Sequence, residues 1–134
     1  TARMLGHVLG IPVHGVCSLD VVAHGVAIPG PFVVATDARR KEVYWAAYDL
    51  AGRRTAGPDV AAPVSVATDL PTAGAGPRLY PEAFPNPVAP QFPNASDLAV
   101  AIANDDVLIL PPKPIYLRRP DARPPAGRKP VLFR

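Results

Sequence analysis

The chain has 134 residues, a net charge of +3 and a single cysteine, Cys17. This length supports one ordinary domain, or one part of a larger one. The lone cysteine excludes an internal disulfide, and no apolar run reaches the roughly 18 residues of a membrane span. We therefore expect a protein of the reducing cytoplasm that does not associate with membranes.

The first residues have the pattern of an amphipathic helix. Four apolar side chains recur at helical spacing, and Gly10 followed by Pro12 supplies a helix end. The sequence thus predicts a helix that ends near Gly10, and its apolar face comprises Met4, Leu5, Val8 and Leu9.

A short strand and a second helix are predicted next. Residues 11–16 are mostly apolar and favour a strand. Ser18 can cap a helix that begins at Leu19, with Asp20 well placed in its first turn. Two glycines and two prolines within residues 25–31 then indicate a boundary.

A β-hairpin is the clearest prediction of the sequence. Residues 31–38 form one apolar run, and residues 42–50 are rich in the β-branched and aromatic side chains that strands prefer. Only residues 39–41 separate them, which predicts an antiparallel pair with a short polar turn. A second turn at residues 51–56 predicts a third strand.

The aromatic residues of the second strand are predicted to divide between two faces. Side chains alternate along a strand, so Tyr44 and Tyr48 share one face and Trp45 takes the other. At least one aromatic group must therefore meet a second packed layer or a partner.

The remaining chain has weaker signals. Residues 64–70 favour a short strand or helix, and residues 74–84 a glycine-rich turn followed by a weak helix. Residues 107–110 are a short apolar run. From about residue 113 the chain is proline-punctuated, and seven basic residues stand against Asp121 as the one acid, which predicts an extended basic tail.

One further helix has clear boundaries. Asn94 or Ser96 can cap it, and Asn104 marks its end. The spacing of Leu98 and Ile102 predicts that these two side chains face inward.

The charged turn of the hairpin has three interpretations. Asp37 and Glu42 flank Arg39, Arg40 and Lys41, and the basic neighbours hold both carboxylates ionised, which suits a salt-bridged turn better than proton transfer. A solvated turn is favoured, a partner or RNA contact is the alternative, and catalysis ranks last.

The histidines do not have the spacing of a metal site. His7, His14 and His24 lie seven and ten residues apart, whereas a helical zinc protease site needs two histidines four apart with a glutamate between them. Cys17 ends an apolar run, where a thiol usually packs. We predict neither a metal nor a catalytic residue here.

Several stretches in this order resemble the TsaB (YeaZ) family of tRNA threonylcarbamoyladenosine biosynthesis proteins. The most specific are VATDARRKEVYWAAYD and PPKPIYLRRPDA, together with IPVHGVCSLDVVA. The weaker stretches TAGAGPRLYPEAF and PNASDLAVAIA fall between them in the expected order. The resemblance covers nearly the whole chain.

The resemblance implies an actin-like, Hsp70-like (ASKHA) ATPase fold of two α/β lobes. Residues 1–30 would be the end of the first lobe, and residues 31–134 the C-terminal lobe with a basic tail from about residue 113. The family's opening strand and its glycine-rich stretch are not in this sequence, so we expect that an N-terminal part is missing. Without the cleft between lobes, we expect no bound cofactor.

The family further implies a non-catalytic scaffold that activates the catalytic subunit TsaD and, through it, works with the ATPase TsaE. Homodimerisation and indirect or weak contact with tRNA are also expected. A metallo-glycoprotease of the M22 type and an RNA-binding module using the turn and tail are the alternatives. The helix face Met4, Leu5, Val8 and Leu9 is the candidate partner interface, and the candidate family-signature, RNA or partner contacts are Asp37, Arg39, Arg40, Lys41, Glu42, Tyr116, Arg118 and Arg119.

Overall fold

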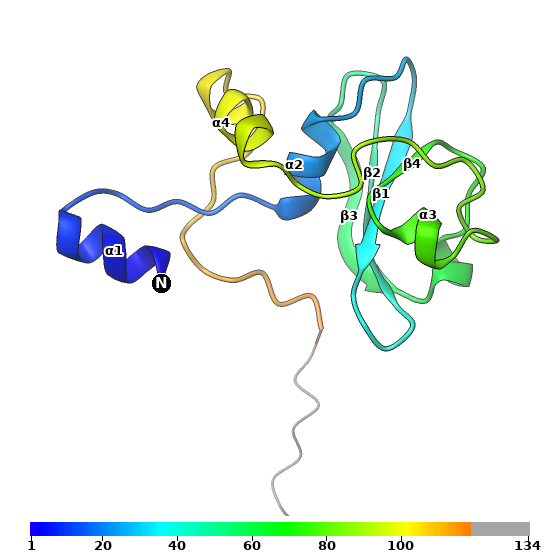
Figure 1. The fold of residues 1–134 in the computed structure, drawn as a ribbon, viewed down its shortest axis with the longest axis horizontal. Coiled ribbons are helices and arrows are strands. Elements are labelled where there is room, and N and C mark those ends of the chain that lie inside the picture. The colour runs from blue at the N-terminus through cyan, green and yellow to red at the C-terminus, as the bar shows by residue number, and fades with distance from the viewer. Residues whose placement is uncertain (119–134) are drawn as a thin grey trace, which may run out of the picture.

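The computed structural model describes residues 1–118, which form a small mixed sheet with helices on both faces (Figure 1). The sheet has four strands in the order β3-β2-β1-β4. The elements are α1 (Ala2–Leu9), α2 (Ser18–His24), β1 (Phe32–Asp37), β2 (Val43–Tyr48), β3 (Arg54–Ala61), the 3-10 turn η1 (Pro63–Val66), β4 (Thr72–Ala73), α3 (Gly76–Leu79) and α4 (Ala95–Ala103).

The predicted hairpin and third strand are confirmed. β1 and β2 pair antiparallel from Phe32 opposite Tyr48 to Asp37 opposite Val43, and β3 pairs antiparallel with β2. The two-residue strand β4, which the sequence did not predict, pairs parallel with β1. β1 is therefore an inner strand with a neighbour on each side.

One face of the sheet packs against α2. Phe32 and Val34 of β1 and Ala46 and Tyr48 of β2 form a buried cluster there. The rings of Phe32 and Tyr48 stack with centroids 5.1 Å apart. From α2, this cluster receives Leu19, Val22 and Ala23.

The opposite face has its own smaller core. Ala35 and Val43 pack with Phe84, and Trp45 and Tyr80 close the cluster. Tyr44 packs instead with the α2-side core. The predicted division of the aromatic residues between two faces is confirmed, and the second packed layer comes from the segment after α3.

Residues 11–16 do not form a strand, and that prediction was wrong. These residues form only an isolated β-bridge, between Gly15 and Leu110. The Gly15 amide donates to the Leu110 carbonyl and the Leu110 amide to the Gly15 carbonyl, both at 2.8 Å. Pro12 has no amide hydrogen to donate, and the apolar run 107–110 meets this segment at Leu110 alone. Without further backbone hydrogen bonds to a neighbouring strand, this extended segment does not become a regular β-strand.

Two helix details also differ from the sequence predictions. Ser18 is the first residue of α2 rather than its cap, and Cys17 occupies the cap position without a side-chain hydrogen bond. In α4, Asn94 is the cap and accepts the Ser96 amide at 2.9 Å, but Ala101 is the buried residue. Ile102 remains 43% exposed, so the expectation that it faces inward holds only in part.

The first helix lies apart from the sheet (Figure 1). α1 ends as predicted, with Gly10 in the left-handed conformation at φ 65°. The short strand or helix predicted within residues 64–70 corresponds to the 3-10 turn η1, and the weak helix predicted within residues 74–84 corresponds to α3.

The close packing of the backbone at Gly74 predicts a large effect of one methyl group. A Cβ there would lie 2.2 Å from the Ala35 carbonyl oxygen, at φ +96°. Gly52 has φ +72° with open space around it. We expect Gly74→Ala to lower the free energy of unfolding by more than about 2 kcal/mol, and Gly52→Ala by about 1 kcal/mol. Equal losses in urea denaturation would contradict the close approach of β1 to this turn.

Candidate functional site

The turn between β1 and β2 has an unusual backbone. Arg39, Arg40 and Lys41 all have positive φ, at 62°, 55° and 60°. The turn is closed by the Ala38 amide, which donates to the Glu42 carbonyl at 3.0 Å, and by the Glu42 amide, which donates to the Arg39 carbonyl at 3.1 Å. Three successive basic residues therefore occupy the exposed tip of the hairpin.

Asp37 holds the first residue of this tip. Its Oδ1 accepts the Arg39 amide at 2.7 Å, and its Oδ2 lies 3.1 Å from Arg39 Nη1. The salt-bridged turn that the sequence favoured is thus present. The Asp37 carboxylate works as a turn-capping acceptor.

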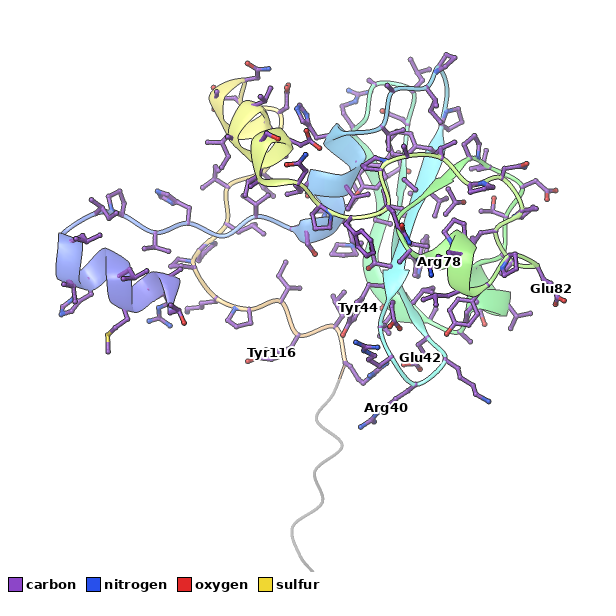
Figure 2. The ribbon with its side chains drawn as sticks, viewed as in Figure 1. Arg40, Glu42, Tyr44, Arg78, Glu82 and Tyr116 are labelled. Atoms are coloured by element: carbon purple, nitrogen blue, oxygen red, sulfur yellow. The ribbon has the colours of Figure 1, made fainter. Side chains whose placement is uncertain are left out.

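Arg118 joins the C-terminal segment to the same turn. Its Nη2 donates to the Ala38 carbonyl at 3.2 Å and forms an ion pair with Glu42 Oε2. Glu42 and Arg118 are 76 positions apart in sequence. Figure 2 shows the segment that carries Tyr116 descending to the end of the molecule where Arg40 and Glu42 lie.

The structure therefore brings together most of the signature residues predicted from the sequence. Asp37, Glu42 and the three basic tip residues share one turn, and Arg118 contacts it. Tyr116 is 83% exposed on the adjoining segment. Arg119 lies outside the described residues.

The predicted partner interface is a separate surface on α1. Met4 is 70% exposed, Val8 is 75% exposed, and Leu5 and Leu9 are exposed to 57% and 64%. Among the residues of this helix, Gly6 alone is buried, and it packs close to Val13 just beyond the helix. The apolar face of α1 is uncovered in the described chain.

A partly buried polar cluster, which the sequence interpretation missed, ties α2 to the sheet. Asp20 of α2 accepts the Tyr48 hydroxyl at 2.8 Å and Arg54 Nη1 at 3.0 Å and 3.1 Å through its two oxygens. Burial, and next the negative charge of Asp20, raise the pKa of Tyr48. The register of β2 against β3 places Tyr48 beside Arg54. This cross-strand pairing is the one feature from which the cluster could have been predicted.

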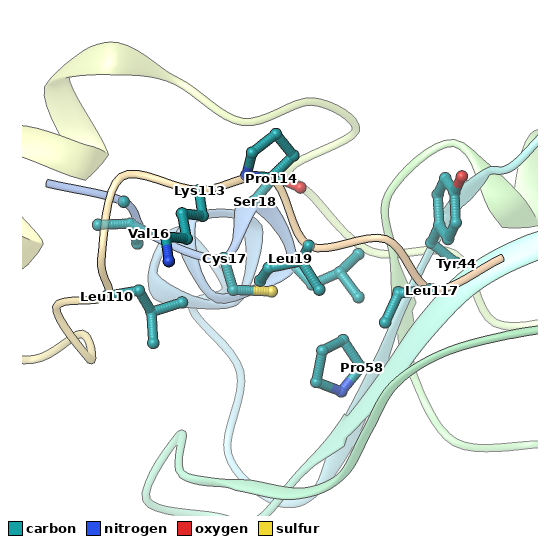
Figure 3. A pocket seen from close by; sticks show the side chains of 12 residues that line it. Val16, Cys17, Ser18, Leu19, Tyr44, Pro58, Leu110, Lys113, Pro114 and Leu117 are labelled. Atoms are coloured by element: carbon teal, nitrogen blue, oxygen red, sulfur yellow. The ribbon is translucent and has the colours of Figure 1, made fainter. Parts of the chain in front are cut away.

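Figure 3 shows a pocket of about 310 Å³ between the start of α2, the sheet and the C-terminal segment. Its wall is mostly apolar and includes the buried Cys17, Pro58 and Leu117, with Lys113 and Tyr44 as polar contributors. Cys17 is a free thiol that packs in the core, as its sequence context predicted.

The three histidines lie on separate segments. His7 is in α1, His14 is in the loop that follows, and His24 ends α2, with its Nδ1 3.9 Å from Asp106. Within residues 1–118, no three His, Cys, Asp or Glu side chains gather as a metal-binding group. In the same part of the chain, no helix has the length and apolarity to cross a membrane.

Comparisons with known proteins agree with this fold. The family model of TsaD, tRNA N6-adenosine threonylcarbamoyltransferase, matches residues 1–106. An uncharacterised protein of Mycobacterium leprae is 44% identical over 135 residues, which is 99% of this chain and 37% of that protein. One of Mycobacterium tuberculosis is 46% identical over 125 residues, which is 92% of this chain and 57% of that protein.

Two solved structures are also similar. YeaZ from Pseudomonas aeruginosa superposes with a TM-score of 0.63 and 28% identity, covering 87% of this chain and 64% of that chain. A protein described as similar to the peptidase YeaZ from the same organism gives a TM-score of 0.60 and 28% identity, covering 87% of this chain and 63% of its own.

The sheet with helices on both faces is thus the actin-like α/β fold that the resemblance predicted. The chain belongs to the TsaD family, and within that family it is TsaB/YeaZ-like. It spans 37% to 57% of the length of these curated relatives. The division into residues 1–30 and 31–134 stays a prediction.

The polar cluster at Tyr48 predicts a specific pH dependence of stability. At neutral pH, Tyr48→Phe should cost about 1–3 kcal/mol, because the hydroxyl donates to a carboxylate. A raised pKa keeps folded Tyr48 protonated, whereas unfolded Tyr48 ionises near its ordinary pKa of about 10. The contribution of the Tyr48 hydroxyl to the free energy of unfolding is therefore fully present below about pH 10, and it is lost as the pH rises further.

The measurement is urea denaturation of both proteins between pH 8 and 11. The difference between wild type and Tyr48→Phe should shrink above about pH 10. Tyr116→Phe is the control and should match wild type throughout, because Tyr116 is exposed. A constant difference for Tyr48→Phe across this range would contradict the assignment.

Proposed function

We propose that this chain is a non-catalytic, TsaB-like subunit of the assembly that forms threonylcarbamoyladenosine in tRNA, and that it docks the catalytic subunit TsaD through α1. The observation that carries the proposal is the uncovered apolar face of α1. Four large apolar side chains, each more than half exposed in the described chain, provide a surface for a partner helix.

The energetics of this face favour docking. Burying one large apolar side chain stabilises a complex by about 1.5–3 kcal/mol before the cost of association. Met4 and Val8 are the most exposed of the four and are one helical turn apart, so they can enter the same groove of a partner. The helix-in-groove mode uses this i, i+4 arrangement.

Three carboxylates of the described chain have structural contacts that are consistent with a scaffold role. Asp20, Asp37 and Glu42 each hold an arginine in a structural ion pair. These groups fix α2, the hairpin turn and the C-terminal segment. Family membership and the likeness to YeaZ support the assignment to tRNA modification.

The proposal predicts that charges on α1 abolish partner binding. The double variant Met4→Glu/Val8→Glu should lose co-purification with TsaD of the same genome by at least about tenfold, because two buried apolar contacts become desolvated carboxylates. The measurement is affinity capture of tagged TsaD from co-expressing cells, quantified for the untagged chain.

Leu50→Glu/Val64→Glu is the matched control. Both side chains are 80% exposed, and both lie away from α1, so the control adds the same charge and should bind TsaD as wild type does. Undiminished binding by the α1 variant would refute the interface. Failure of the wild-type chain to bind TsaD at all would refute the proposed partner.

A further inference from the structure

We propose that residues 110–118, which we call the strap, close an apolar pocket beside Cys17, and that the ion pair between Glu42 and Arg118 is the latch that holds the strap in place. Opening of the strap uncovers the pocket while the sheet stays folded. The device belongs to this chain alone and does not rest on the proposed partner TsaD.

The strap forms one wall of the pocket of about 310 Å³. Its residues in that wall are mostly apolar, and they are Leu110, Lys113, Pro114, Ile115 and Leu117. The opposite wall comes from residues 15–19, Tyr44 and Pro58. Figure 3 shows the strap passing Cys17 and reaching Tyr44. Cys17 is 5% exposed, so its thiol is covered while the strap is in place.

The first end of the strap is fixed to the segment before α2. Gly15 and Leu110 exchange two backbone hydrogen bonds, both at 2.8 Å. The two backbones approach closely here, because a Cβ on Gly15 would lie 2.8 Å from the Pro111 carbonyl oxygen. These contacts make Leu110 the pivot of the strap.

The middle of the strap is held weakly. Within the described chain, no backbone hydrogen bond joins residues 111–117 to another segment. The three prolines of this stretch have no amide hydrogen to donate. Ile115 and Tyr116 are 47% and 83% exposed. A segment with few buried contacts opens locally, and because proline-rich chain is stiff, release of its far end frees the whole stretch.

The far end of the strap is held by Arg118. Its guanidinium pairs with Glu42, and its Nη2 donates to the Ala38 carbonyl at 3.2 Å. The side chains of Arg118 and Glu42 are 25% and 36% exposed, so salt in the solvent screens the pair. An ion pair of this kind shifts an opening equilibrium by up to about fivefold. The latch therefore favours the closed strap and still allows its release.

The experiment follows alkylation of Cys17 by excess iodoacetamide in the full chain, measured by intact mass. Cys17 is the single cysteine of the sequence, so each added group reports this site. Glu42→Gln removes the ion pair and should raise the alkylation rate by about threefold. Arg118→Met also removes the bond to the Ala38 carbonyl and should raise the rate by about tenfold.

Asp37→Asn is the matched control. It removes one carboxylate from the same turn, and the amide oxygen of asparagine can accept the Arg39 amide as the carboxylate does. Asp37 contacts Arg39 rather than the strap, so the control should react at the wild-type rate. An equal gain in the control would overturn the latch, because the effect would then come from the charge of the turn.

Salt and urea separate opening of the strap from unfolding of the whole chain. Raising salt from about 50 to about 500 mM should speed alkylation of the wild type and leave Glu42→Gln unchanged, because only the wild type has the ion pair to screen. Opening of the strap exposes little surface, so urea below the unfolding transition should barely change either rate. Equal rates in the wild type and Glu42→Gln, or a wild-type rate that rises with urea as steeply as global unfolding, would overturn the inference.

Discussion

The rest of the structure depends on the pairing of β1 with β2 and on the burial of this hairpin on both faces. Phe32 and Tyr48 stack on the side of α2, while Ala35 and Val43 pack beneath Phe84 on the other side. A one-residue slip of the register would exchange these two sets of side chains between faces of different shape. Because the register is fixed in this way, the position of the turn at its end is also fixed.

The hairpin turn and the proposed docking helix α1 lie at the periphery of this packed centre. At the hairpin turn, Asp37 holds Arg39, and Arg118 contacts Ala38 and Glu42. α1 extends in another direction, with its apolar side chains uncovered. Asp20 and Arg54 form a partly buried ion pair between α2 and the sheet, and the Tyr48 hydroxyl donates a further hydrogen bond to Asp20.

Sequence predicted the elements whose signals are local. Alternation identified the hairpin and divided Tyr48 from Trp45, and Gly10 ended α1 as expected. Prediction from the sequence failed where the structure of a segment depends on residues that are distant in the chain. The strand β4 is two residues long and exists through its pairing with β1, and residues 11–16 lack a neighbouring strand. The pairs Glu42–Arg118 and Asp20–Arg54 join residues 76 and 34 positions apart, so neither has a local pattern.

If α1 docks TsaD, amide hydrogen exchange measured with and without TsaD should report the contact at that helix. Docking should add strong protection in residues 2–9, where Met4, Leu5, Val8 and Leu9 are 57–75% exposed in the described chain, with little change in the strands β1 and β2. Added protection that leaves residues 2–9 unchanged and falls on the sheet or on α4 would contradict it.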